Sequence, residues 1–109
     1  MNDYRLNFFK KASLCRHFEN KVFQLSKEKI IKYPVYLSAG QEFISSSLST
    51  IYHDLDICPD IFIQHRGHST YLAFGGSIEL LILELLGDSK GCANGMGGSA
   101  SIQCKEKKI

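Results

Sequence analysis

Apolar residues recur every three or four positions over residues 4–31, which is the spacing of one face of an α-helix. The face consists of six residues: Phe8, Ala12, Cys15, Phe18, Val22 and Leu25. Charged residues such as Glu19 and Lys21 fall at the other positions. The pattern predicts a long amphipathic helix that ends before Tyr33-Pro34, because proline lacks a backbone donor and disfavours helical geometry in the residue before it.

A second helix is predicted over residues 40–52. Its apolar face combines Phe43, Ile44, Leu48 and Ile51. The other positions carry five small hydroxyl residues, which permit close helix packing: Ser45, Ser46, Ser47, Ser49 and Thr50. Residues 53–56 are typical of a loop, and Pro59 precedes the apolar run at residues 61–63, which fits a buried strand or the start of another helix. We favour the strand.

A third helix is predicted over residues 77–86. Ser77 is suited to cap it, Glu79 lies in its first turn, and Gly87 is suited to end it. This helix is apolar on almost all sides, and a chain of 109 residues offers only two other helices to cover it. We therefore expect a partner or further sequence. The glycine loop, residues 87–101, follows and holds five of the nine glycines.

Composition supports a folded, mostly α unit over residues 1–109, a single partial domain, with 44% hydrophobic and 22% charged residues. The net charge of +2 is spread along the chain, which disfavours nucleic-acid binding. No apolar run is long enough to cross a bilayer, so no membrane role is expected. The four cysteines form no C-x-x-C pair and no charged-then-apolar leader opens the chain, so we expect a cytoplasmic setting.

The first candidate site is the run Gln64-His65-Arg66-Gly67-His68, in which three groups can carry positive charge. Arginine binds phosphate through paired, charge-assisted hydrogen bonds. Two alternatives remain open: Arg66 could instead bind helix carbonyls beside two surface histidines, or His65 and His68 could bind zinc. The zinc site needs a third ligand that no motif supplies.

The glycine loop is the second candidate. Residues 95–100 match the pattern G-x-G-x-x-[GA], but they follow a helix rather than a strand, which disfavours a dinucleotide site. The loop amides could face an anion or a neighbouring subunit, or the loop could be a mobile surface segment. Cys58 and Cys92 lack a histidine at a diagnostic spacing, and Asp54 and Asp56 are typical of turns. No catalytic residue is assigned.

Five motifs in order resemble the alpha subunits of thiamine-diphosphate-dependent 2-oxo acid dehydrogenases, the decarboxylating first component of the pyruvate and branched-chain complexes. They are Arg16-His17-Phe18-Glu19, Gly40-Gln41-Glu42, Gln64 to His68, Glu84-Leu85-Leu86-Gly87, and Gly91-Cys92 through Gly97-Gly98-Ser99. The resemblance implies the N-terminal part of an α/β thiamine-diphosphate-binding fold. It covers the chain from the first predicted helix to about Ser101.

The resemblance also implies roles for individual residues. Those matching His65 and Arg66 hold the cofactor diphosphate, with Gln64 beside them. The possible active-site entrance carries His68, Gly97, Gly98 and Ser99. The chain departs from the family at three places: the family usually has Tyr at position 65, the pyruvate-type enzymes tend to have His at position 36, and Met-His usually stands where Ala100-Ser101 stands here.

For the complete enzyme, the resemblance implies thiamine diphosphate, and Mg²⁺ whose ligands lie in a Gly-Asp-Gly to Asn motif that this chain lacks. It also implies a beta subunit in an alpha2beta2 assembly and a lipoyl-bearing acyltransferase that takes the acyl group after decarboxylation of a 2-oxo acid. By itself the chain should be inactive. Alternatives are a transketolase-like or other decarboxylating thiamine enzyme of sugar or polysaccharide metabolism, and a non-catalytic remnant or interaction module.

Overall fold

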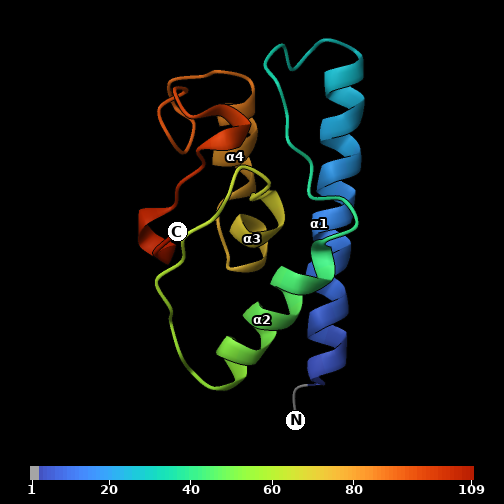
Figure 1. The fold of residues 1–109 in the computed structure, drawn as a ribbon, viewed down its shortest axis with the longest axis vertical. Helices are drawn as coiled ribbons and strands as arrows, with labels where there is room; N and C mark the ends of the chain where they lie inside the picture. Colours follow the sequence, from blue (N-terminus) through green and yellow to red (C-terminus); the bar gives the residue numbers. More distant parts are fainter. Residues whose placement is uncertain (1–2) are drawn as a thin grey trace.

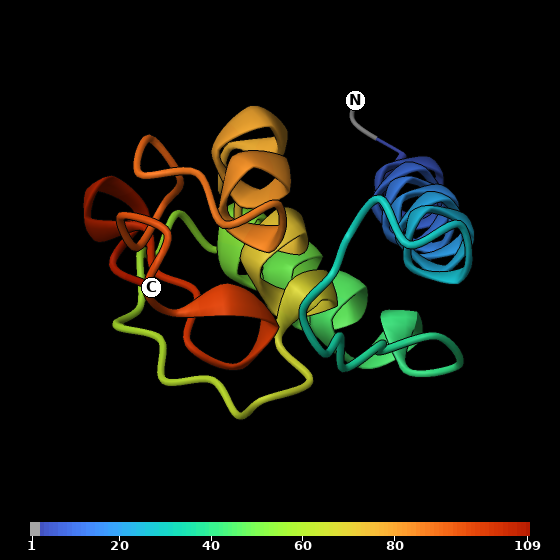
Figure 2. The ribbon, with the colours of Figure 1, turned by 90° about the horizontal axis from the view of Figure 1, so that it is seen from above.

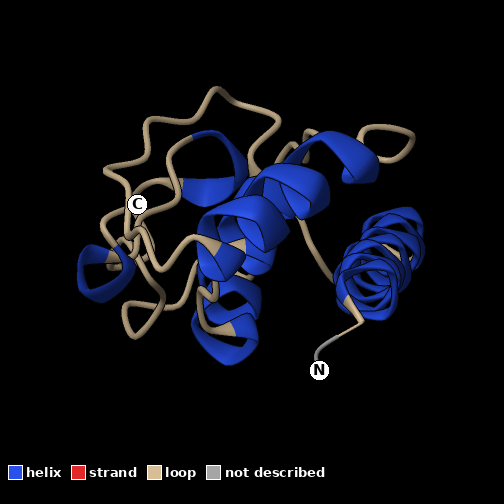
Figure 3. Ribbon diagram, turned by 90° about the horizontal axis from the view of Figure 1, so that it is seen from below, coloured by secondary structure: helices blue, strands red, loops and turns tan. Residues whose placement is uncertain are grey.

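The computed structural model describes residues 3–109, which contain four α-helices. These are α1 (Tyr4–Lys27), α2 (Glu42–Asp54), α3 (His68–Ala73) and α4 (Ile78–Leu85), and two 3-10 turns follow, η1 (Gly98–Ala100) and η2 (Lys105–Lys107). The described part of the chain has no strand (Figure 3). The prediction of a mostly α segment is therefore confirmed.

Helix α1 runs along one side of the molecule, and α2 packs at an angle against the N-terminal half of α1. Helix α3 lies in the middle, between α1 and the C-terminal segment (Figures 1 and 2). Helices α1, α2 and α3 contact one another, and α4 contacts η1. The apolar core joins Phe18 and Val22 of α1 to Tyr71 of α3 and to Leu81 and Leu85 of α4. The long periodic pattern of α1 therefore faces the core as predicted, and α3 is central to it.

Helix α1 ends at Lys27, earlier than the predicted end at residue 31. Lys29 adopts a left-handed backbone with φ of 61°, and the N–H groups of Ile30 and Ile31 both donate to the Leu25 carbonyl. This turn closes the helix before Tyr33-Pro34 is reached. Ile31 stays buried, which explains why it still fits the apolar pattern.

The prediction of a buried strand at residues 61–63 is wrong. The segment is extended but pairs with no strand, since the Ile61 N–H donates to the Lys108 carbonyl at 2.8 Å and the Phe62 side chain is 97% exposed. Helix α3 begins five residues later, and the whole helix lies between Gly67 and the pair Gly75-Gly76. Its six residues are too few to show a helical period in the sequence.

Helix α2 packs with its polar face inward. Ser45, Ser46, Ser49 and Thr50 are buried, whereas Phe43, Ile44, Leu48 and Ile51 are exposed. Hydroxyls bridge to α3: Ser45 Oγ lies 2.7 Å from Thr70 Oγ1, and Ser49 Oγ donates to the Ala73 carbonyl at 2.6 Å. The small residues thus make the close contact expected of them, and the apolar face of α2 is left on the surface. No helix among the described residues is both long and apolar enough to span a bilayer.

Two buried serines of α2 give a matched stability test. Among the described residues, Ser46 Oγ is the buried side-chain polar atom without a hydrogen-bond partner, whereas Ser49 Oγ is bonded to Ala73 and to Lys11. Ser46→Ala should either raise the free energy of unfolding or lower it by less than about 0.5 kcal/mol. Ser49→Ala should lower it by about 1–3 kcal/mol. Urea unfolding of both variants measures this, and equal losses would contradict the hydrogen-bond assignment.

Candidate anion-binding site

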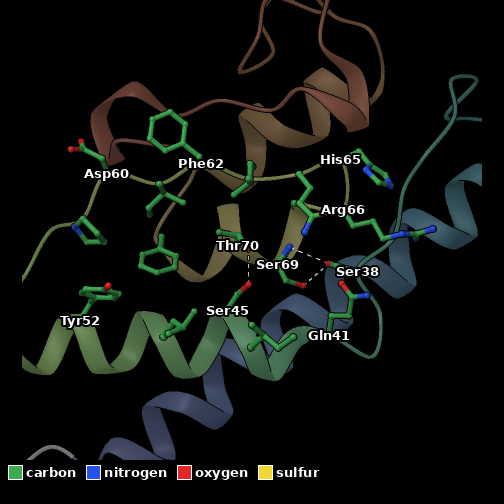
Figure 4. A pocket seen from close by; sticks show the side chains of 18 residues that line it. Ser38, Gln41, Ser45, Tyr52, Asp60, Phe62, His65, Arg66, Ser69 and Thr70 are labelled. Carbon is green, nitrogen blue, oxygen red and sulfur yellow. Dashed lines mark hydrogen bonds between the residues drawn. The ribbon is translucent and has the colours of Figure 1, made fainter.

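A cavity of about 500 Å³ lies between α2, α3 and residues 59–67. Figure 4 shows His65, Arg66, Ser38 and Gln41 at one end and Tyr52 and Asp60 at the other. Apolar side chains also line the cavity, including Ile44, Leu48, Ile61 and Phe74. The polar end holds a cation beside hydroxyl and amide groups, which is the chemistry that binds an anionic group.

Arg66 is exposed at this polar end. Its Nη1 donates to the Leu37 carbonyl at 2.8 Å, and Leu37 lies in the loop before α2 rather than in a helix. The alternative in which Arg66 satisfies helix carbonyls is therefore not what the structure shows. A guanidinium carries five N–H donors in a fixed fork, so one bond to Leu37 sets its orientation and leaves other donors for a ligand.

His65 contacts Tyr36. The two rings meet edge to face, with centroids 5.2 Å apart at an angle of 88°. These are the two positions at which the sequence departs from the family around this site, one having His for Tyr and the other Tyr for His. The structure thus brings both departures together, beside Arg66 and the exposed Gln64.

His68 is fully buried, so it does not share the exposed surface of His65 and Arg66. Its Nδ1 lies 2.6 Å from Glu19 Oε1, and its Nε2 lies 2.8 Å from Ser99 Oγ. A joint zinc site of His65 and His68 does not form, and among residues 3–109 no cluster of three or more His, Cys, Asp or Glu is placed to hold a metal ion. The structure does bring His68 to Ser99, two residues grouped at the entrance by the sequence.

Glu84 is the residue that the sequence interpretation missed. Its buried carboxylate accepts four backbone N–H groups of the glycine loop. Oε1 binds Ala93 N at 2.5 Å and Gly95 N at 3.0 Å, and Oε2 binds Gly97 N and Gly98 N, each at 3.0 Å. The loop amides therefore face an anion, and this anion belongs to the chain itself.

Burial alone would raise the pKa of Glu84, but the four N–H groups outweigh burial and hold the pKa below its ordinary value of 4.5. Glycine is needed beside this carboxylate. A Cβ on Gly91 would lie 2.5 Å from Glu84 Cα, and Gly95 has a φ of 76°. The sequence signal for the arrangement is a carboxylate in the middle of the apolar run at residues 80–86, followed by closely spaced glycines.

An ion pair joins the first two motifs of the sequence. Arg16 on α1 binds Glu42 at the start of α2 through Nε and through Nη2, the latter 3.3 Å from Oε2. Gly40 N donates to the same carboxylate at 2.8 Å. The Arg16 hydrogen bond holds the pKa of Glu42 below its usual range. This pair fixes the loop carrying Leu37 and Ser38, which forms one wall of the cavity.

Neither Cys15 nor Cys92 offers an activated thiolate. Burial raises the pKa of Cys15 to about 11 and also raises the pKa of Cys92. A thiol is a nucleophile in its deprotonated form, and burial opposes deprotonation. Cys15 instead donates its thiol to the Ser69 carbonyl at 3.6 Å.

The fold and the site define a helical segment with a candidate anion-binding site at one end of its cavity. The family model described as "Dehydrogenase E1 component" matches residues 10–109, and the chain belongs to this family. It is 34% identical over 101 residues to the alpha-1 subunit of the mitochondrial pyruvate dehydrogenase E1 component of Oryza sativa subsp. japonica, covering 93% of this chain and 25% of that protein. It is 31% identical over 99 residues to the alpha subunit of acetoin:2,6-dichlorophenolindophenol oxidoreductase of Bacillus subtilis, covering 91% of this chain and 29% of that protein.

The chain thus spans between 25% and 29% of the length of these curated relatives. No solved structure matches it. The resemblance drawn from the five motifs is confirmed at the level of the family.

Glu84→Gln tests the loop arrangement. A glutamine amide offers an acceptor at one position and a donor at the other, so about half of the four loop N–H groups lose their acceptor. We expect faster hydrogen exchange at Ala93, Gly95, Gly97 and Gly98, and a loss of about 1–3 kcal/mol in the free energy of unfolding. The matched control is Glu79→Gln, in the exposed first turn of the same helix, which should leave the loop exchange unchanged and cost less than about 1 kcal/mol.

The lowered pKa of Glu84 also predicts how the free energy of unfolding changes with pH. A carboxylate whose pKa is lower in the folded chain adds stability above its unfolded pKa, near 4.5, and loses this contribution as the pH falls through the lower folded value. Unfolding free energies measured from pH 7 downwards should therefore fall less steeply below about pH 4.5 in Glu84→Gln than in the parent chain. Parallel curves would contradict the role given to the carboxylate.

Proposed function

We propose that the chain is the segment of a thiamine-diphosphate-dependent 2-oxo acid dehydrogenase alpha subunit that binds the cofactor's diphosphate. One observation carries this: the Arg66 guanidinium is oriented by the Leu37 carbonyl at the polar end of a cavity that is large enough for part of a ligand. Membership of the Dehydrogenase E1 component family supports it.

The residues at this end suit a diphosphate. Arg66 supplies a charged fork, His65 and Gln64 supply further donors, and the hydroxyls of Ser38 and Ser69 line the same wall. Each charge-assisted hydrogen bond contributes about 1.5–3 kcal/mol. When bound, the cofactor supplies the decarboxylation chemistry, while the protein binds and orients it. The glycine loop is not a second phosphate cradle in this proposal, because Glu84 occupies its amides.

Assembly is the second part of the proposal. The relatives are named as alpha subunits, and the exposed apolar face of α2 is suited to burial in a larger structure. We propose a beta subunit as partner, an alpha2beta2 arrangement, a lipoyl-bearing acyltransferase as acceptor, and Mg²⁺ ligands outside this chain. Ala100-Ser101 in place of Met-His, together with the acetoin-acting relative, favours as a second candidate a thiamine enzyme with a different substrate.

Arg66→Ala tests the diphosphate assignment. In the assembly with the beta subunit and Mg²⁺, calorimetry should show thiamine diphosphate binding weakened about 10- to 100-fold, because one or more charge-assisted bonds are lost. Arg66→Lys keeps the charge but not the fork, so it should recover only part of the loss.

The matched control is Arg5→Ala, which removes an exposed arginine outside the cavity and should leave the affinity unchanged. Thiamine without its diphosphate is the control ligand, and its binding should not depend on Arg66. Unchanged thiamine diphosphate affinity in Arg66→Ala would refute the assignment.

The Tyr36 and His65 pair gives a separate prediction. Tyr36→His and His65→Tyr should each lower stability and cofactor affinity, since each leaves two like rings where one large and one small ring pack edge to face. The exchanged double variant should recover most of the loss, with a coupling of about 0.5–1.5 kcal/mol. Thermal unfolding and calorimetry of all four chains measure this coupling, and simple additivity would show that the contact has no energetic importance.

A further inference from the structure

His68 joins α1 and the glycine loop to the segment that carries Arg66. It follows Arg66 by two residues, its Nε2 lies 2.8 Å from Ser99 Oγ, and its Nδ1 lies 2.6 Å from Glu19 Oε1. Ser99 Oγ also accepts the Tyr36 N–H at 2.9 Å, and Glu19 Oε2 accepts the Ser38 N–H at 2.7 Å. All of these polar groups are therefore satisfied by one another.

The bonds fit the following pattern of donors and acceptors, with His68 as a neutral ring. Tyr36 N–H donates to Ser99 Oγ, the Ser99 hydroxyl donates to His68 Nε2, and His68 Nδ1–H donates to Glu19. This order resembles that of a serine hydrolase. The geometry excludes a nucleophilic role, however, because Ser99 is 3% exposed and the neighbouring amides of Gly97 and Gly98 are bound to Glu84 instead of forming an oxyanion hole.

We propose that His68 is a positioning residue that couples the glycine loop to Arg66, and this rests on the proposed function. On one side, Ser99 follows Gly98, whose N–H is held by Glu84. On the other side, Glu19 holds the backbone of Ser38, next to the Leu37 carbonyl that orients Arg66. His68 thus attaches the glycine loop, through its Nε2 bond to Ser99, to the segment that carries Arg66, while Glu19 holds the Ser38 N–H with its other oxygen.

Replacing His68 by asparagine or by glutamine tests the two hydrogen bonds of its ring separately. The amide of asparagine reaches about as far as Nδ1, so His68→Asn can keep the bond to Glu19 and loses the bond to Ser99. The amide of glutamine reaches about as far as Nε2, so His68→Gln can keep the bond to Ser99 and loses the bond to Glu19. Ser99→Ala removes the loop connection with the smallest change in volume, and Ser101→Ala, exposed in the same loop, is its control.

The test measures thiamine diphosphate affinity in the assembly with the beta subunit and Mg²⁺. It also measures, without cofactor, the amide hydrogen exchange of Ser69 and Tyr71, whose N–H groups donate to Ser38 Oγ and to the Gly67 carbonyl. Ser99→Ala and His68→Asn should weaken the affinity about tenfold, which is about 1.4 kcal/mol, and should speed the exchange. His68→Gln should stay within about threefold of the parent, and Ser101→Ala should match it. In an Arg66→Ala background, Ser99→Ala should cause no further loss.

If His68→Asn and His68→Gln lose equal thiamine diphosphate affinity, and the loss follows their loss of thermal stability, the histidine is merely structural and the proposal is overturned. If the His68 variants do not fold, the Ser99→Ala and Ser101→Ala pair decides. Normal affinity in Ser99→Ala beside a loss in Arg66→Ala would overturn this proposal and leave the diphosphate assignment standing. If Arg66→Ala binds normally, the diphosphate assignment fails, and unchanged exchange at Ser69 and Tyr71 in Ser99→Ala would overturn the coupling as well.

Discussion

The carboxylate of Glu84 is the group on which the arrangement of the C-terminal half depends. Four backbone N–H groups in a loop of closely spaced glycines would repel one another and lose hydration if buried without an acceptor. The carboxylate gives all four an acceptor at once, at the end of a helix that is otherwise apolar. Its charge is stabilised in return, and this is why its pKa is depressed despite burial.

The position of Ser99 follows from this constraint. Because Gly97 and Gly98 donate their N–H groups to Glu84, the next residue, Ser99, lies in contact with the buried ring of His68. From His68 the polar contacts continue to Glu19 on α1 and to Ser38 in the loop before α2. A small helical unit therefore carries a connected set of buried polar groups, each satisfied, and its exposed cation at Arg66 lies beside that set.

Elements with a repeating apolar pattern could be predicted from the sequence. The period of residues 4–31 extends over several turns, so α1 could be predicted, whereas α3 is too short to repeat and the apolar run at residues 61–63 lacks the neighbouring strand that would make it part of a sheet. The periodic pattern set Glu19 apart from the apolar face of the first helix, yet Glu19 is 1% exposed because His68, distant in sequence, supplies its partner.

The acceptor in the glycine loop was likewise hidden from sequence reasoning, since its donors are backbone groups that no residue type reveals. The motif at residues 64–68 was recognisable, but the sequence could not show that Arg66 faces a cavity while His68, two residues away, faces the interior. The family resemblance depended on motif order, which the chain retains, and the contact between Tyr36 and His65 depends on the fold.

The central claim is that the glycine loop already holds the chain's own anion and that an external diphosphate binds at Arg66. A nitrogen-15 NMR titration with thiamine diphosphate, with the chain labelled and assembled with the beta subunit and Mg²⁺ and with thiamine as the control ligand, tests both halves together. The account predicts that the Arg66 side-chain N–H and the amides of residues 64–66 shift with the diphosphate form, while those of Ala93, Gly95, Gly97 and Gly98 do not. Shifts at these four loop amides, with Arg66 unmoved, would contradict it.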